Sequence, residues 1–374
     1  MIREPNTLTA TEAASSIASG VLSSVDLVQS CLDQISNTDD QIKAWEYVDS
    51  DKALEQAKEC DRIRRQGKSI GRLHGVPVGL KDIIDTVDMP TQLGTAVFQG
   101  RQTKKDARLV ERLREAGAVI MGKTVTTELA FLHPSKTRNP HNLERTPGGS
   151  SSGSAAAVAA NHIPIAVGTQ TNGSVIRPAS FCGTYGFKPT AGIISRSGIL
   201  QTSETLDQVG CFGRSLADIG LLGDVLGSYD QNDINSFSRP RPKMYDGALS
   251  DPPVTPNIAW LDLPFYDRLA SETREGLDAI NDILGAQVSK MTAADQLSNL
   301  VAVQARIHEY EICKHQSDVF DQSWDGLSDT LKLAIKRARK ISSDEYSDAL
   351  AVKLSAQDFF ADFFIALRLP AINL

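Results

Sequence analysis

Three stretches of the sequence place hydroxyl and amine side chains where they could transfer an acyl group. The first is Gly148–Ser154, in which Ser150 lies among glycines and serines directly before an alanine-rich helix expected over 154–160. Small residues let backbone amides approach a ligand closely, and the start of a helix favours negative charge. A flexible Gly/Ser linker has a similar composition, but this run leads straight into a strong helix former. The stretch therefore predicts a functional loop.

The second stretch is Gly168–Pro178, which follows an apolar run predicted as a buried strand over 163–167. A strand, a turn of small residues and a proline in the first helical turn together expose the hydroxyl of Ser174. An ordinary strand-to-helix turn fits this stretch equally well. The amides that could converge on a developing oxyanion are those of Thr171, Asn172, Gly173 and Ser174.

The third stretch ends in Lys81, which follows an apolar strand predicted over 76–80. A lysine at the end of a buried strand is costly unless it is paired or uncharged. Burial lowers the pKa of a lysine from about 10.4 toward roughly 7–8, where the amine can act as a base. Taken alone, Lys81 is better explained as a surface lysine paired to Asp82 or Asp85.

Together and in this order, the three stretches resemble the amidase signature family. The hallmark of that family is a Gly-x-Pro…Lys-Asp strand, then a Gly-Gly-Ser-Ser loop, then a Gly-Ser turn on a helix. The serines lie 174 − 150 = 24 residues apart, as the family pattern requires. The resemblance covers about residues 5–220 and continues weakly to the end. Flanking segments that also match are 109–124, 138–142, 181–183 and 186–190.

The resemblance implies hydrolysis of a small amide by a Ser–cisSer–Lys triad. Neutral Lys81 takes a proton through Ser150, the cis-serine relay, from Ser174, which attacks the carbonyl carbon and becomes acylated. The amides of the nucleophile turn hold the oxyanion. Ser151 supports the hydrogen-bond network and is assigned to the substrate-binding set. No metal or organic cofactor is implied.

Two departures from the family pattern bear on the substrate. Gln170 and Asn172 stand where the family commonly has Asp and Gly, and Arg177 lies three residues after the nucleophile rather than two. An arginine so placed could bind a substrate carboxylate in a bidentate pair. A structural salt bridge is an equally good explanation of Arg177.

Three other interpretations stay open. Residues 149–153 also fit a GxSxG elbow with Ser151 as nucleophile, which needs a downstream histidine and leaves Lys81 and Ser174 without a role. The glutaminase component of a tRNA-dependent amidotransferase shares all three stretches. An inactive, truncated relative is the third, because the chain stops inside an apolar segment, 366–374, that resembles a family strand. The histidines available to the elbow are His162, His308 and His315.

Alternating short strands and helices must position these groups, and they predict an α/β fold with a mixed central sheet covered by helices on both faces. Thr9 and Glu12 form a capping box that opens a helix ending at Gly20. We expect a single domain over 1–374 with a catalytic core at 70–220. A Pro/Asp-rich loop at 228–256 leads into a mostly helical region, 228–365 overall, that shapes the substrate pocket. Other expected elements are helices at 24–35, 51–66 and 107–116 and strands at 43–48, 118–121 and 258–263.

Composition limits the partners. The chain has 374 residues and a net charge of −7, so a phosphate backbone would repel it, and nucleic acid is not an expected partner. Five cysteines without a CxxC pair fit reduced thiols in the cytoplasm. The sequence shows no secretory signal and no run long enough to span a membrane. The expected partner is a small-molecule amide, with a homodimer open.

Overall fold

The computed structural model describes residues 4–262, 266–292 and 297–366. They divide into two compact units, one of 1–249 with 314–334 and the other of 250–313 with 335–374. The division after Leu249 falls inside the segment 228–256, where the sequence predicts a long loop. That segment also contains a short helix, α8 (Met244–Leu249). The C-terminal apolar segment from 367 onward lies outside the described residues.

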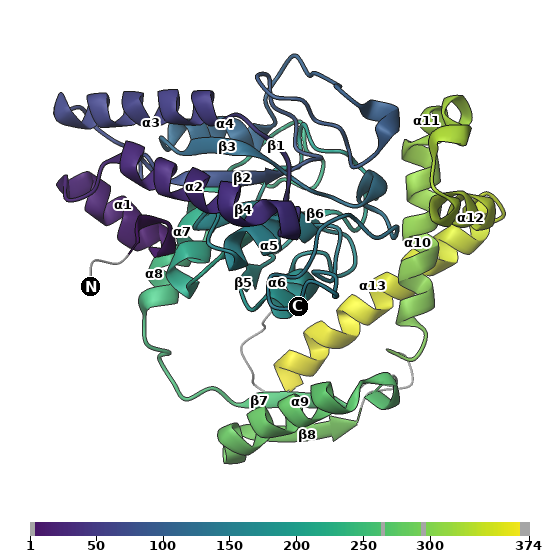
Figure 1. Cartoon of the computed structure of the whole chain (residues 1–374). Helices are drawn as coiled ribbons and strands as arrows, with labels where there is room; N and C mark the ends of the chain where they lie inside the picture. The colour runs from purple at the N-terminus through teal and green to yellow at the C-terminus, as the bar shows by residue number, and fades with distance from the viewer. Residues whose placement is uncertain (1–3, 263–265, 293–296, 367–374) are drawn as a thin grey trace. The chain divides into compact units, whose positions relative to one another are not determined.

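The first unit is built on a six-stranded mixed sheet in the order β1-β3-β2-β4-β6-β5 (Figure 1). The three middle strands β3, β2 and β4 run parallel, while β1, β6 and β5 pair antiparallel to their neighbours. The mixed α/β fold expected from the sequence is confirmed. The strands are β1 (Trp45–Val48), β2 (Pro77–Lys81), β3 (Val119–Thr124), β4 (Ile165–Gln170), β5 (Tyr185–Phe187) and β6 (Gln208–Gly213).

Helices cover this sheet on both faces. Val119, Met121 and Ala166 pack into one buried cluster with the alanines of α5 and with α2 and α3. Successive residues of a strand point to opposite faces, and Ile120, Ile165 and Val167 are also buried, so a second layer must cover them. The helices of this unit are α1 (Ala10–Ser19), α2 (Ser24–Ile42), α3 (Ser50–Arg65), α4 (Arg108–Glu115), α5 (Ser152–Ala159), α6 (Ile176–Cys182), α7 (Leu216–Leu226), α8, and α11 (Ser317–Gln322).

Local signals in the sequence explain several element ends. Thr9 and Glu12 form the expected capping box at the start of α1, and Gly20 ends the helix in the left-handed conformation. Helix α2 runs to Ile42, seven residues past its expected end at Ile35. It stops where Lys43 adopts a left-handed conformation and the Asp39 carboxylate accepts a hydrogen bond from the Ala44 amide at 2.7 Å.

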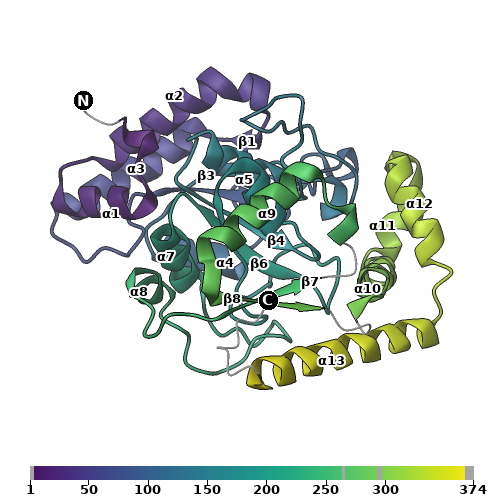
Figure 2. The ribbon, with the colours of Figure 1, turned by 90° about the horizontal axis from the view of Figure 1, so that it is seen from below.

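The second unit holds a parallel two-stranded sheet of β7 (Ile258–Asp262) and β8 (Val288–Thr292), joined by α9 (Ser271–Leu284) (Figure 2). The strand β8 lies in a region expected to be helical. Helix α13 (Ser343–Ala366) also belongs to this unit, and α10 (Leu300–His315) and α12 (Asp329–Ala338) cross the division between the units.

The described residues of both units also contain short 3-10 helices. They are η1 (Pro5–Thr7), η2 (Ala96–Phe98), η3 (Glu128–Ala130), η4 (Tyr266–Arg268), η5 (Gly285–Gln287) and η7 (Trp324–Gly326).

Candidate active site

Lys81 is the last residue of β2, a strand flanked on both sides by parallel neighbours. The carboxyl ends of such strands are the usual place for a site in an α/β sheet. Its Nζ lies 2.7 Å from Ser150 Oγ and 2.8 Å from Thr169 Oγ1, and the residue is 0% exposed. Burial lowers the pKa of Lys81 to about 7, and the charge of Asp207 partly opposes this shift.

The two aspartates that could have paired with Lys81 are engaged elsewhere. The Asp82 carboxylate accepts from the Gln92 amide at 3.0 and 3.1 Å, and Asp85 forms an ion pair with Arg101 at 2.8 Å. The ordinary explanation, a surface lysine paired to either residue, therefore does not describe Lys81 in this structure.

The glycine-rich loop before α5 delivers Ser150 to this lysine. Ser150 is 5% exposed and Ser174 is 7% exposed. The Ser150 amide donates to Ser174 Oγ at 3.1 Å, so the loop contacts the amine through a hydroxyl and the second serine through its backbone. The structure thus brings Lys81, Ser150 and Ser174 together from three separate segments. Every peptide bond in the described ranges is trans, so Ser150 reaches Lys81 in this structure without the cis bond that the family resemblance implies.

Ser151 is fully buried, and its hydroxyl is used to join the loop to β4. The hydroxyl donates to the Thr169 carbonyl at 3.0 Å and accepts from the Thr169 amide at 3.2 Å. Both bonds go to a strand backbone and fit the expected role of Ser151 in the hydrogen-bond network, while its role in substrate binding stays a prediction. The structure also speaks against Ser151 as an elbow nucleophile, since the ring nitrogens of buried His162 face Thr38 and Trp45 instead.

The turn between β4 and α6 presents Ser174. Gln170 Oε1 accepts from the amides of Val175 at 2.9 Å and Ile176 at 3.0 Å, so this side chain caps the start of α6. The glutamine that replaces the usual family aspartate therefore still holds the turn. The amides of Asn172, Gly173 and Ser174 donate to no protein acceptor within the described ranges. An oxyanion hole formed by Thr171, Asn172 and Gly173 stays a prediction.

Arg177 lies in the first turn of α6 with an exposed side chain, and its Nε donates to the carbonyl of Gly148. It therefore connects helix α6 to the glycine-rich loop. A role in binding a substrate carboxylate stays a prediction.

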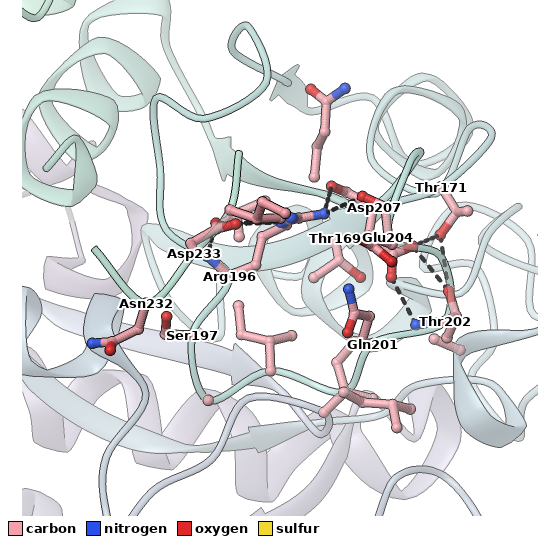
Figure 3. Close-up of a pocket in the computed structure, with 18 residues that line it drawn as sticks. Thr169, Thr171, Arg196, Ser197, Gln201, Thr202, Glu204, Asp207, Asn232 and Asp233 are labelled. Carbon is pink, nitrogen blue, oxygen red and sulfur yellow. Dashed lines mark hydrogen bonds and ion pairs between the residues drawn. The ribbon is translucent and has the colours of Figure 1, made fainter. Parts of the chain in front are cut away.

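A cavity of about 420 Å³ opens beside this arrangement (Figure 3). Thr169, which accepts a hydrogen bond from Lys81, and Thr171, the first residue of the turn that carries Ser174, both line it. Ile83, Ile199, Leu200 and Val209 supply apolar wall, while the charged lining residues are Arg196, Glu204, Asp207 and Asp233. No local pattern indicates these charged residues or Thr169, because their roles depend on contacts between distant segments.

The fold and the site define an α/β protein in which a buried lysine and two loop serines meet at the end of a mixed sheet. A family model described as Amidase matches residues 26–361, and the chain belongs to the amidase family. No helix of the described residues is long and apolar enough to cross a membrane.

Among curated proteins, the A component of the glutamyl-tRNA(Gln) amidotransferase from Thermobifida fusca (strain YX) is 43% identical over 247 residues, which are 64% of this chain and 50% of that protein. The corresponding protein from Chloroflexus aggregans (strain MD-66 / DSM 9485) is 39% identical over 249 residues, which are 65% of this chain and 51% of that protein. The chain spans about half the length of these curated relatives.

Two solved structures are similar along most of the chain. The native peptide amidase from Stenotrophomonas maltophilia matches with a TM-score of 0.77 and 28% identity, over 97% of this chain and 82% of that one. A protein from a vestigial complex, described as revealing the origins of an s-triazine catabolic enzyme, matches with a TM-score of 0.87 and 28% identity. The match covers 94% of this chain and 78% of that one.

Proposed function

We propose that this chain hydrolyses the C–N bond of a small carboxamide through an acyl-enzyme on Ser174. The observation that carries this proposal is the fully buried Lys81 amine, 2.7 Å from the Ser150 hydroxyl, with a pKa lowered to about 7. An amine with such a pKa is partly uncharged near neutral pH and can accept a proton. Membership of the amidase family supports the same chemistry.

In the proposed acylation, Ser174 Oγ attacks the carbonyl carbon while its proton passes to Ser150, and the Ser150 proton passes to Lys81. The amides of the nucleophile turn hold the negative oxygen of the tetrahedral intermediate. When the C–N bond breaks, Ser150 gives a proton to the leaving nitrogen and recovers one from the Lys81 ammonium. Water then attacks the ester by the same relay, which releases a carboxylic acid and restores Ser174.

An ammonia-release screen over acidic, neutral and aromatic amides tests the activity. We expect Ser174→Ala and Lys81→Ala to lose it and Ser150→Ala to be nearly as impaired. Ser180→Ala is the matched control, because Ser180 is an exposed serine on the same helix α6. Retained activity in Lys81→Ala would contradict the assigned base.

A second candidate is the glutaminase step of a tRNA-dependent amidotransferase. The similarity to glutamyl-tRNA(Gln) amidotransferase proteins favours it. The chemistry at Ser174 is the same, with the side-chain amide of glutamine as substrate. Hydrolysis of glutamine well above that of other small amides would support this candidate, whereas broad activity on unrelated amides would favour a free-standing amidase.

An inactive relative is distinguished by labelling rather than by turnover. A fluorophosphonate probe reacts only with an activated serine, so it should label the unaltered chain and leave Ser174→Ala unlabelled. A folded chain that is not labelled and releases no ammonia would support the inactive interpretation.

A further inference from the structure

Asp207 lies on the wall of the cavity, immediately before β6, and its carboxylate is held rigidly. Oδ1 accepts from the hydroxyls of Thr171 at 2.6 Å and Thr202 at 2.9 Å. Oδ2 accepts from the amides of Thr202 at 2.7 Å and Ser203 at 2.8 Å. All four donors are uncharged, so none of them neutralises the charge of the carboxylate.

The other charged groups of the cavity have ionic partners. Arg196 pairs with Asp233 at 2.8 Å, as Figure 3 shows, and donates to the backbone carbonyls of Glu204 and Asp207. The Glu204 carboxylate lies 3.7 Å from the amine of Lys314 and 3.9 Å from the ring of His315. Within the described ranges, no lysine, arginine or histidine forms an ion pair with Asp207. Lys81 is the cation whose charge Asp207 influences, so when that amine is uncharged a ligand in the cavity meets the Asp207 carboxylate without a counter-ion.

We propose that Asp207 is a specificity-determining residue that makes the cavity select uncharged and cationic amides and reject amides carrying a carboxylate. The proposal rests on the proposed amidase function. A fixed charge in a partly enclosed cavity disfavours ligands of the same sign, because neither water nor a counter-ion screens the repulsion fully. The proposal predicts the opposite of the carboxylate-binding role expected for Arg177, whose exposed side chain donates to the carbonyl of Gly148.

The same carboxylate is tied to the catalytic groups in two ways. It anchors Thr171, the first residue of the nucleophile turn, and it is the charge that favours the protonated form of Lys81. The other groups in contact with the Lys81 amine, Ser150 and Thr169, are uncharged. Removing the negative charge at position 207 therefore lowers the pKa of Lys81, and the rise of kcat/KM with pH moves to lower pH. A purely structural residue would not produce this effect.

Three amides of similar size and different charge test the selectivity: butanamide, succinamate and 3-aminopropanamide. For the unaltered enzyme, kcat/KM for succinamate should be lower than for butanamide by about tenfold or more, which corresponds to about 1.4 kcal/mol. Asp207→Asn should reduce this discrimination about tenfold and shift the rising limb to lower pH. Glu55→Gln, which removes an exposed charge on α3, should change neither quantity.

Thr171→Val separates positioning from charge, because it removes one hydrogen bond to Asp207 and keeps the carboxylate. It should lower kcat for all three amides and leave their ratios unchanged. If Asp207→Asn does not fold, the ratio measured on the unaltered enzyme decides. Hydrolysis of succinamate as efficient as that of butanamide would overturn the proposal, even with amidase activity present. Absence of hydrolysis of every amide tested would instead contradict the proposed function.

Discussion

Thr169 Oγ1 accepts a hydrogen bond of 2.8 Å from Lys81 Nζ, which ties the next-to-last residue of β4 to the last residue of β2. An uncharged amine has two hydrogens and one lone pair. With one hydrogen directed to Thr169, the lone pair can face the hydroxyl of Ser150, which supplies the proton in the proposed mechanism. In that mechanism, Thr169 is a positioning residue for the base.

Replacing Thr169 with valine tests this relationship, because the change removes the acceptor and keeps the shape. We expect kcat to fall about 10- to 100-fold, the equivalent of about 1.4–2.7 kcal/mol, with little change in KM. Thr169→Ser should recover most of the rate. Steady-state kinetics on one neutral amide measure the effect, and a valine variant as fast as the parent would show that the contact does not orient the base.

The pH dependence of the proposed activity follows from the pKa of Lys81. The uncharged amine is the active form, so kcat/KM should rise with pH and level off above about 7. At about pH 5, two units lower, the rate should be roughly 100-fold below the plateau, since each unit removes tenfold of the active form. A rising limb near the ordinary lysine value of 10.5 would mean that the amine is not buried in solution.

The cap formed by Gln170 should matter both for stability and for the nucleophile. Gln170→Leu removes the oxygen that accepts from Val175 and Ile176 while keeping similar bulk. We expect a loss of about 1–2 kcal/mol in unfolding free energy and a lower kcat, because Ser174 directly precedes the capped amides. Gln170→Glu keeps an acceptor and should retain the stability. Denaturant unfolding and steady-state kinetics on the parent and the two variants measure the unfolding free energy and kcat. A leucine variant equal to the parent in both quantities would show that the cap contributes to neither.

We expect the buried His162 side chain to make the protein less stable in acid. Trp45 Nε1 donates to its Nδ1 at 3.1 Å, and its Nε2 lies 2.7 Å from Thr38 Oγ1, so the ring is held uncharged. Burial lowers its pKa from 6.5 to about 4. Because the pKa of His162 is lower in the folded than in the unfolded protein, the unfolded state binds a proton first as the pH falls. The stability that the uncharged ring contributes is therefore complete above the unfolded-state pKa and is lost as the pH falls from about 6.5 to about 4. The full loss is about 3 kcal/mol for a shift of this size.

The measurement compares unfolding free energies of the parent and His162→Gln at about pH 7.5 and about pH 4.5. The variant should be the less stable protein at the higher pH, and the difference should shrink at the lower one. A difference that stays constant between the two conditions would show that His162 does not titrate as its burial implies.

Sequence patterns predicted the helices and strands whose formation depends on residues close together in the chain. The capping box at Thr9 and the buried strands ending at Lys81 and before Ser174 depend on neighbouring residues, and the structure has them within a few positions. The antiparallel strands β5 and β6 were not anticipated, because their stability comes from pairing with β4 and not from a local period. The contacts of Asp207 with Thr171 likewise join residues 36 positions apart and leave no local trace.

The first unit is completed by a segment, 314–334, that the ribosome makes after most of the second unit. In it, the Ser328 amide donates at 3.0 Å to the carboxylate of Glu128, two residues before the cavity-lining Ala130. The Gln316 side chain donates at 2.9 Å to the carbonyl of Gln201 on the cavity wall. A nascent chain ending at residue 249 lacks both contacts. The contacts of the first unit that are described here are therefore complete only after residues 314–334 have been synthesised.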